Sequence, residues 1–152
     1  MGVGKSTVGP LVAVRLGLPF VDLDGEIERA ANATVAALFA RDGEPGFRVL
    51  ETRTLEAVAA GPPAVVALGG GTLHARPENR ALLGGVPVVW LQVSWPLLEA
   101  RLKGSTSRPL VNRAKELYEV RRPELAHPDH IVDADGAPEV VAARIVALLQ
   151  GT

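Results

Sequence analysis

The residues with the most specific chemistry stand at the start of the chain, where glycines precede a lysine and a serine. Gly4-Lys5-Ser6 matches the last three fixed positions of the nucleotide phosphate-binding pattern G-x-x-x-x-G-K-[ST]. Glycine lets backbone N–H groups turn toward an anion, and the helix expected to begin near Lys5 adds unpaired N–H groups. A lysine here can reach the β- and γ-phosphates of a nucleotide, and the serine hydroxyl can bind Mg²⁺. These residues therefore indicate a nucleotide polyphosphate site.

The pattern is partial, so a second interpretation stays open at this point. The first glycine of the motif, and the hydrophobic strand that leads into it, would lie before Met1. Taken alone, the segment fits an ordinary glycine-rich helix start about as well as a phosphate-binding loop. The choice between the two depends on the residues that follow.

Two carboxylates close the next apolar segment. Residues 18–24 read as a short buried strand that ends in Asp22 and Asp24. Ligands of open α/β sheets gather beyond the carboxyl ends of the strands, and residues two apart in an extended segment point the same way. One acid could hold Mg²⁺ through water while the other accepts a hydrogen bond from a substrate hydroxyl. The alternative for Asp24 is a simple helix cap.

An arginine and a run of glycines supply two further candidates. Arg48 follows a turn at residues 42–48 and opens a long helix, where it could grip a substrate carboxylate with a bidentate contact or form a surface salt bridge. Gly69-Gly70-Gly71 ends the apolar run 64–68. Three glycines at the end of a strand indicate either a backbone that another group approaches closely or a flexible hinge.

The pattern of the whole chain predicts an α/β fold with a parallel, helix-covered sheet, because strands and helices alternate. Strands are expected at residues 18–24, 64–68, 86–93 and 130–133. Helices are expected at 5–16, 26–40, 48–60, 77–84, 96–103, 114–125 and 139–149. The polar segment 104–110 between two of these helices is typical of a mobile lid.

Composition limits the classes of partner. The chain has 152 residues, enough for one domain, and 47% of them are hydrophobic. The net charge of −1 argues against a nucleic acid or an anionic membrane held by bulk electrostatics. The chain contains no cysteine, which fits a reducing compartment. A cytoplasmic protein is therefore expected.

The order of the motifs resembles the shikimate kinase family, small P-loop phosphotransferases, along nearly the whole chain. The matching segments are Gly2–Thr7, Asp22–Asp24, Gly43–Arg48, Leu68–Gly71, Arg108–Leu110 and Leu117–Pro123. The resemblance implies a single domain over residues 1–152 with three layers, α/β/α, and a lid at about 104–114. The sheet of the family is five-stranded, and its first strand is expected to be missing from this chain. The family resemblance also suggests a monomer.

The resemblance further implies transfer of the ATP γ-phosphoryl group to the 3-hydroxyl of shikimate, on the route to chorismate and the aromatic amino acids. Catalysis would fall to Lys5, Asp24 and Arg108, and one Mg²⁺ would be held by Ser6 with Asp22. ATP would be bound by Gly2, Val3, Gly4, Lys5, Ser6, Thr7, Arg101 and Arg108, with the loop 133–138 beside the adenine. Shikimate would be bound by Asp24, Arg48, Gly70, Gly71 and Arg121.

Three departures from the family pattern leave alternatives open. The missing start raises the possibility of a non-catalytic remnant that binds shikimate or nucleotide. The span from Arg108 to Arg121 is several residues shorter than usual, which affects the lid. Arg122 is an alternative to Arg121 as the carboxylate ligand, although the spacing to Pro123 favours Arg121. A different P-loop kinase, acting on gluconate or a nucleotide, is the other enzyme hypothesis.

Overall fold

The four strands form two separate parallel pairs. The computed structural model describes residues 3–104 and 108–151. Strand β1 (Phe20–Asp22) pairs with β2 (Val65–Ala67), and β3 (Val89–Gln92) pairs with β4 (His130–Asp133). Each strand lies inside the segment expected from the sequence, so the four strands and their parallel direction are confirmed. Within the described ranges, no backbone ladder joins β2 to β3.

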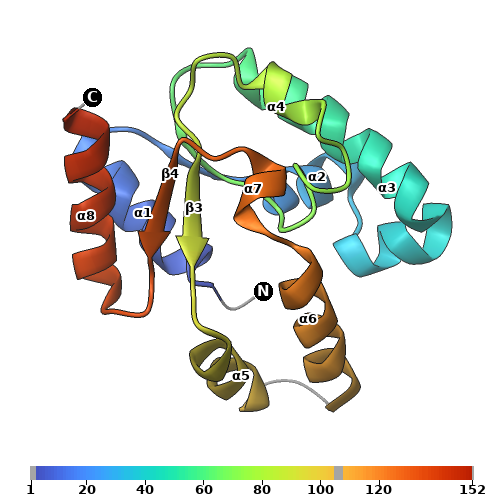
Figure 1. Cartoon of the computed structure of the whole chain (residues 1–152). Helices are drawn as coiled ribbons and strands as arrows, with labels where there is room; N and C mark the ends of the chain where they lie inside the picture. The colour runs from blue at the N-terminus through green and yellow to red at the C-terminus, as the bar shows by residue number, and fades with distance from the viewer. Residues whose placement is uncertain (1–2, 105–107, 152) are drawn as a thin grey trace.

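Helix α1 (Lys5–Leu16) begins and ends where the sequence predicts. Glycines in the left-handed region flank it at both ends, with φ 98° at Gly4 and φ 66° at Gly17. It packs beside the C-terminal helix α8 (Pro138–Gln150), and the two run next to each other in Figure 1. Helix α1, which begins at the phosphate-binding segment, is therefore fixed by its contact with α8.

The segment after β1 differs from the expectation of a single helix at 26–40. Helix α2 (Leu23–Ala31) ends at Asn32, whose φ of 49° is left-handed, and α3 (Val35–Ala59) then begins after Thr34. The Thr34 hydroxyl accepts a hydrogen bond from the backbone N–H of Ala37 (3.1 Å) and so caps α3. Asparagine tolerates the left-handed conformation and threonine favours caps, which explains the break. The expected turn at 42–48 is reduced to one non-helical residue in α3, Gly43 (φ 69°, ψ 178°).

The remaining helices follow the predicted order with shifted bounds. They are α4 (Asn79–Leu82), α5 (Trp95–Lys103), α6 (Arg108–Val120) and α7 (Pro123–Ala126). Helix α6 begins six residues earlier than expected, so part of the segment predicted as a loop is helical. The helix expected at 114–125 is divided before Pro123, because proline disfavours helical geometry in the residue that precedes it. Residues 105–107 of the predicted lid lie outside the described part.

Two hydrophobic cores hold these elements. The first core joins α1, β3, β4, α5, α6 and α8, and includes Val8, Val12, Val93, Leu102, Val132 and Val141. The second core lies under α2 and α3 and comprises Leu23, Ile27, Leu38, Phe47 and Leu55. Helices α8 and α3 lie on opposite sides of the molecule in Figure 1. The fold thus has two hydrophobic cores, and the β1–β2 pair lies between α1 of the first core and α2 of the second.

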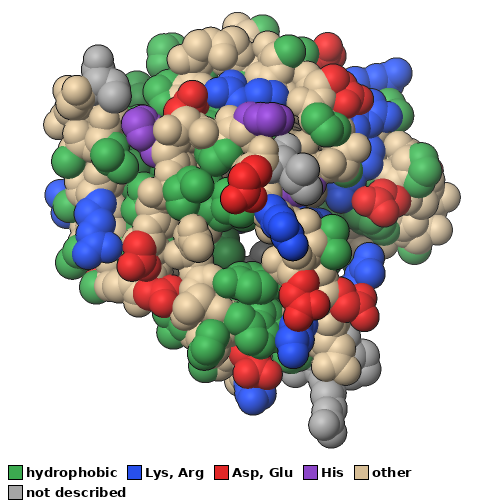
Figure 2. Space-filling model, viewed as in Figure 1, with side chains coloured by type: hydrophobic (Ala, Val, Ile, Leu, Met, Phe, Trp, Pro, Cys, Tyr) green, Lys and Arg blue, Asp and Glu red, His purple; other side chains and the backbone are tan. Residues whose placement is uncertain are grey.

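The surface carries charges of both signs. On the face shown in Figure 2, acidic and basic side chains are interspersed. Among the described residues, each helix is too short or too polar to cross a lipid bilayer.

Candidate active site

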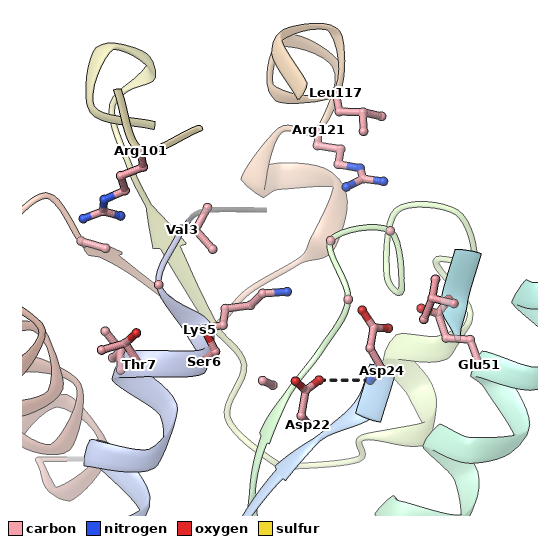
Figure 3. Close-up of a pocket in the computed structure, with 18 of the residues that line it drawn as sticks. Val3, Lys5, Ser6, Thr7, Asp22, Asp24, Glu51, Arg101, Leu117 and Arg121 are labelled. Atoms are coloured by element: carbon pink, nitrogen blue, oxygen red, sulfur yellow. Dashed lines mark hydrogen bonds between the residues drawn. The ribbon is translucent and has the colours of Figure 1, made fainter. Parts of the chain in front are cut away.

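An open cavity of about 800 Å³ collects the residues that the sequence singled out. It is bounded by the start of α1, the end of β1, the helix α3, the glycine segment after β2, and the helices α5 and α6. Figure 3 shows the Lys5 ammonium extending toward the side where Asp24 and Arg121 lie, with Arg101 on the opposite side. The carboxyl ends of the strands and one helix N-terminus therefore face a common space.

The phosphate-binding segment forms a tight turn into α1. The carbonyl of Gly4 accepts hydrogen bonds from the N–H groups of Thr7 (3.1 Å) and Val8 (2.7 Å). Ser6 and Thr7 are exposed at the cavity, and Val3 also lines it. The first N–H groups of a helix have no partner within the helix, so this end can receive an anion. Gly2, predicted to contact ATP, lies outside the described residues.

Lys5 and Asp24 form the charged centre of the cavity. The Lys5 ammonium donates a hydrogen bond to the carbonyl oxygen of Leu68 at the end of β2. Burial lowers the pKa of Lys5, and the nearby charge of Asp24 opposes that shift. Burial also raises the pKa of the Asp24 carboxyl, and Lys5 again opposes the shift. A base with a raised pKa beside a cation is an arrangement suited to proton and phosphoryl transfer.

Asp22 differs from Asp24 in its surroundings. Its side chain is exposed at the end of β1 and accepts a hydrogen bond from the backbone N–H of Asp24 (3.1 Å), drawn as the dashed line in Figure 3. It is thus the N-cap of α2, the role that the sequence left open for Asp24. Both carboxylates line the cavity.

The glycine segment provides space for two arginines. A methyl group added at Gly71 would lie 2.8 Å from Cζ of Arg48, and one added at Gly70 would overlap Nη1 of Arg121. These separations are shorter than real Cβ contacts, so a side chain at either position would displace the guanidinium that lies against it. Neither Gly70 nor Gly71 has a positive φ, so backbone conformation alone does not call for glycine at these positions. The close-approach interpretation of this segment therefore accounts for the structure, and the hinge interpretation is not needed.

Arg48 is buried rather than a surface residue. Its Nη1 donates to Oε1 of Glu51 (2.8 Å), and its Nη2 donates to Oε1 of Glu44 (3.2 Å). Burial, followed by the charge of Arg48, lowers the pKa of the half-buried Arg121 guanidinium. An arginine remains charged even so, because its pKa is far above neutral. Two guanidinium groups held near each other at the cavity can bind an anion between them.

The remaining predicted ligands are divided between the two sides of the cavity. Arg101, on α5, lines the cavity together with Ala134, Gly136 and Pro138, which belong to the predicted adenine loop. Arg121 lines it from the residue after α6, whereas Arg122 is exposed and is not among the lining residues. The side chain of Arg108, the first residue of α6, lies outside the described part of the molecule.

Sequence reasoning missed three buried polar residues beside the site: Glu51, Thr72 and Asn79. Glu51 lines the cavity, and its side chain is 0% exposed. The spacing of three between Arg48 and Glu51 in a helix was the available signal. No local pattern could identify Thr72 or Asn79, because their partners come from other segments of the chain.

Comparison with known proteins gives one consistent result. The family model of shikimate kinase matches residues 1–150. The shikimate kinase of Nostoc punctiforme is 41% identical over 157 residues, which cover 98% of this chain and 86% of that protein. The shikimate kinase of Cereibacter sphaeroides is 39% identical over 152 residues, or 95% of this chain and 76% of that protein.

Solved structures agree with the sequence comparisons. The crystal structure of the Bacteroides thetaiotaomicron shikimate kinase superposes with a TM-score of 0.88 and 32% identity, covering 99% of this chain and 94% of that chain. The Acinetobacter baumannii shikimate kinase, solved in complex with shikimate, gives a TM-score of 0.86 and 33% identity over 99% of this chain and 89% of that chain. The chain, whose cavity is lined by residues from five of the six matching segments, belongs to the shikimate kinase family of ATP-dependent phosphotransferases.

Proposed function

We propose that this cavity transfers the γ-phosphoryl group of ATP to the 3-hydroxyl of shikimate, giving ADP and shikimate 3-phosphate on the route to chorismate. The supporting observation is that Lys5 and Asp24 line the same cavity as Arg48 and Arg121. Phosphoryl transfer requires positioning and charge neutralisation more than covalent chemistry. A cation and a carboxylate facing two guanidinium groups meet that requirement for an anionic acceptor.

The nucleotide side of the site is assigned to α1, α5 and the loop 133–138. Backbone N–H groups from the glycine-rich turn bind the phosphates, and the Lys5 ammonium exchanges its contact with the Leu68 carbonyl for the β- and γ-phosphates. Arg101 and the loop 133–138 flank the adenine, since both line one side of the cavity. Arg108 is assigned to the moving phosphoryl group on the basis of its motif.

The acceptor side is assigned to β1, α3, the glycine segment and the end of α6. Arg48 and Arg121 bind the carboxylate of shikimate, and the backbone of Gly70 and Gly71 closes the pocket beneath them. Asp24 accepts a hydrogen bond from the 3-hydroxyl and takes its proton as the bond to phosphorus forms. Burial raises the pKa of the Asp24 carboxyl, which makes it a better proton acceptor than an ordinary aspartate. The solved complex of the Acinetobacter baumannii relative holds shikimate, in keeping with this assignment.

The residues present fit one Mg²⁺ held together with the nucleotide. Within the described ranges, no group of three or more His, Asp or Glu side chains could hold a metal by itself. The exposed Ser6 hydroxyl and Asp22 carboxylate both line the cavity and offer the oxygen ligands that Mg²⁺ prefers. Mg²⁺ commonly takes one or two protein ligands, several waters and phosphate oxygens. When bound, it would neutralise charge on the β- and γ-phosphates.

The same proposal extends to organisation and location. A single domain over residues 1–152 with a three-layer arrangement, a lid at about 104–114, a monomeric state and a cytoplasmic location all rest on the family resemblance. Size-exclusion chromatography with light scattering would test the monomer directly. A mass of twice that of the chain would contradict it.

The activity itself is tested by a comparison of acceptors. The protein is incubated with ATP and Mg²⁺ and with shikimate, gluconate or AMP, and ADP release is followed while the products are identified by mass spectrometry. We expect ADP and a phosphorylated product when shikimate is the acceptor, and neither when the acceptor is gluconate or AMP. Equal turnover of gluconate or AMP would favour the other P-loop kinase hypothesis. Shikimate binding without any turnover would favour the non-catalytic remnant.

A further inference from the structure

Four buried polar side chains beside the cavity belong to one hydrogen-bonded chain. Among the described residues, Arg48, Glu51, Thr72 and Asn79 are the polar or charged side chains that are buried. Three of them, all but Arg48, are 0% exposed. A buried polar group is costly unless it is paired, so the partners of these side chains show what the burial achieves.

The contacts run from helix α4 to the arginine without interruption. Oε1 of Glu51 accepts from Nη1 of Arg48 (2.8 Å), and Oε2 accepts from the Thr72 hydroxyl (2.8 Å). The carbonyl of Thr72 in turn accepts from Nδ2 of Asn79 (3.0 Å), whose Oδ1 accepts from the Thr52 hydroxyl (3.1 Å). Each Glu51 oxygen thus has one strong donor, and neither is open to water.

The second acidic partner of Arg48 is of a different kind. The Glu44 side chain is 59% exposed, against 0% for Glu51, so water competes for its contact with the arginine. Its distances to Arg48 are also longer, 3.4 Å to Nε and 3.2 Å to Nη2. Glu51 is therefore the residue that fixes the guanidinium, and Glu44 adds a weaker contact at the rim.

We propose that Thr72 is a positioning residue for the acceptor carboxylate, acting through Glu51 on Arg48. This inference rests on the proposed role of Arg48. Thr72 directly follows Gly71, the glycine against which the Arg48 guanidinium lies. Its hydroxyl orients Glu51, and its backbone carbonyl is held by Asn79. One residue thus couples the guanidinium to the glycine backbone against which it lies.

Loss of the hydroxyl should disturb Arg48 specifically. Glu51 would keep Arg48 as its donor but would have an unpaired oxygen in a place that water does not reach. The carboxylate would then turn toward another donor and carry Nη1 of Arg48 with it. The result is a misplaced guanidinium in a pocket whose nucleotide side is unchanged.

The test uses Thr72→Val, which keeps the shape and removes the hydroxyl, and Thr72→Ser, which keeps the hydroxyl. We expect Thr72→Val to raise the KM for shikimate by about tenfold, as for loss of a hydrogen bond to a charged group, with the KM for ATP within about twofold. Thr72→Ser should restore the KM for shikimate to within about twofold of the original. A role in folding alone would lower Tm in Thr72→Val without separating the two KM values.

Thr54→Val is the matched control. The Thr54 hydroxyl donates a hydrogen bond to the carbonyl of Leu50 within α3 (2.8 Å). Among the residues that the structure describes, it makes no hydrogen bond to the hydrogen-bonded chain around Glu51. Its replacement should leave both KM values unchanged. If Thr72→Val does not fold, Thr72→Ala removes the same hydroxyl with a smaller side chain, so the same rise in the KM for shikimate is expected.

A double-mutant cycle separates this inference from the proposed function. In an Arg48→Ala background, Thr72→Val should add nothing to the KM for shikimate, because its effect passes through the missing arginine. If Arg48→Ala leaves that KM unchanged, the role of Arg48 is wrong. If Arg48→Ala raises it and Thr72→Val does not, the role of Arg48 stands and the role of Thr72 is overturned.

Discussion

The guanidinium of Arg48 lies directly against the α-carbon of Gly71, with no room between them for a side chain. A methyl group at Gly71 would be 2.8 Å from Cζ and 2.9 Å from Nη1 of Arg48. Both atoms belong to a buried group that is already fixed by Glu51, so the arginine cannot move away without breaking that pair. A side chain at position 71 would therefore displace the guanidinium from the place where Glu51 holds it.

Gly71→Ala should displace Arg48 and weaken binding of the acceptor. We expect the KM for shikimate to rise by at least about tenfold, since a hydrogen-bonded charge contact is lost or distorted, with little change in the KM for ATP. Steady-state kinetics with each substrate varied would measure both values. Gly85→Ala is the control, because a methyl group there meets nothing within 4 Å. An unchanged KM for shikimate in Gly71→Ala would mean that Arg48 does not contact the substrate from this position.

Arg48→Ala should affect one substrate far more than the other. Removal of one partner of a desolvated carboxylate–arginine contact costs about 2–5 kcal/mol, which corresponds to a rise of at least about thirtyfold in the KM for shikimate. The KM for ATP should change by much less. Arg53→Ala, an exposed arginine on the same helix, should change neither. Equal effects of Arg48→Ala on both substrates would count against its assignment to the carboxylate.

Lys5→Ala should abolish turnover and leave shikimate binding largely intact. The ammonium is the cation proposed to contact the transferred phosphoryl group, whereas the carboxylate pocket is formed by other residues. Calorimetric titration with shikimate in the absence of ATP would measure binding, and ADP release would measure turnover. Retention of more than a small fraction of the original kcat would overturn the role given to Lys5.

Asp22→Asn should move the acid limb of the pH profile to lower pH. Burial is the main cause that raises the pKa of Asp24, and the negative charge of Asp22 raises it further. The acid limb of kcat/KM for shikimate should therefore lie above the ordinary aspartate value of about 3.9. Removal of the Asp22 charge makes ionisation of Asp24 easier, so the limb moves down while the maximal rate also falls. A limb that moves up, or stays in place, would show that Asp24 does not control it.

The parts of the fold that the sequence predicts well are those set by local patterns. The apolar spacing and Gly17 predict helix α1, and short segments rich in apolar residues predict the four strands. The break between α2 and α3 was missed because the apolar pattern continues through it, while Asn32 and Thr34 act through backbone conformation and capping. The early start of α6 was missed because glycine and serines precede it.

The candidate site shows the same division. The family resemblance predicts that Lys5, Asp24, Arg48 and Arg121 face one cleft, and all four line the cavity. The pairing of Arg48 with Glu51 could have been predicted, because residues three apart in a helix lie on the same face. The hydrogen bond from Thr72 to Glu51 joins residues 21 apart in the chain, and that from Thr52 to Asn79 joins residues 27 apart. Contacts of this kind depend on packing, which a single sequence does not reveal.

The division into two hydrophobic cores has a consequence for how the molecule responds to its ligands. Arg48 is on α3, in the region of the second core, and Arg121 follows α6, which packs on the first. A carboxylate held by both arginines would link a helix of the second core to the end of a helix of the first, and so oppose local opening of both. Saturation with shikimate should then slow amide exchange in α3 and α6 together, although the two helices share neither core.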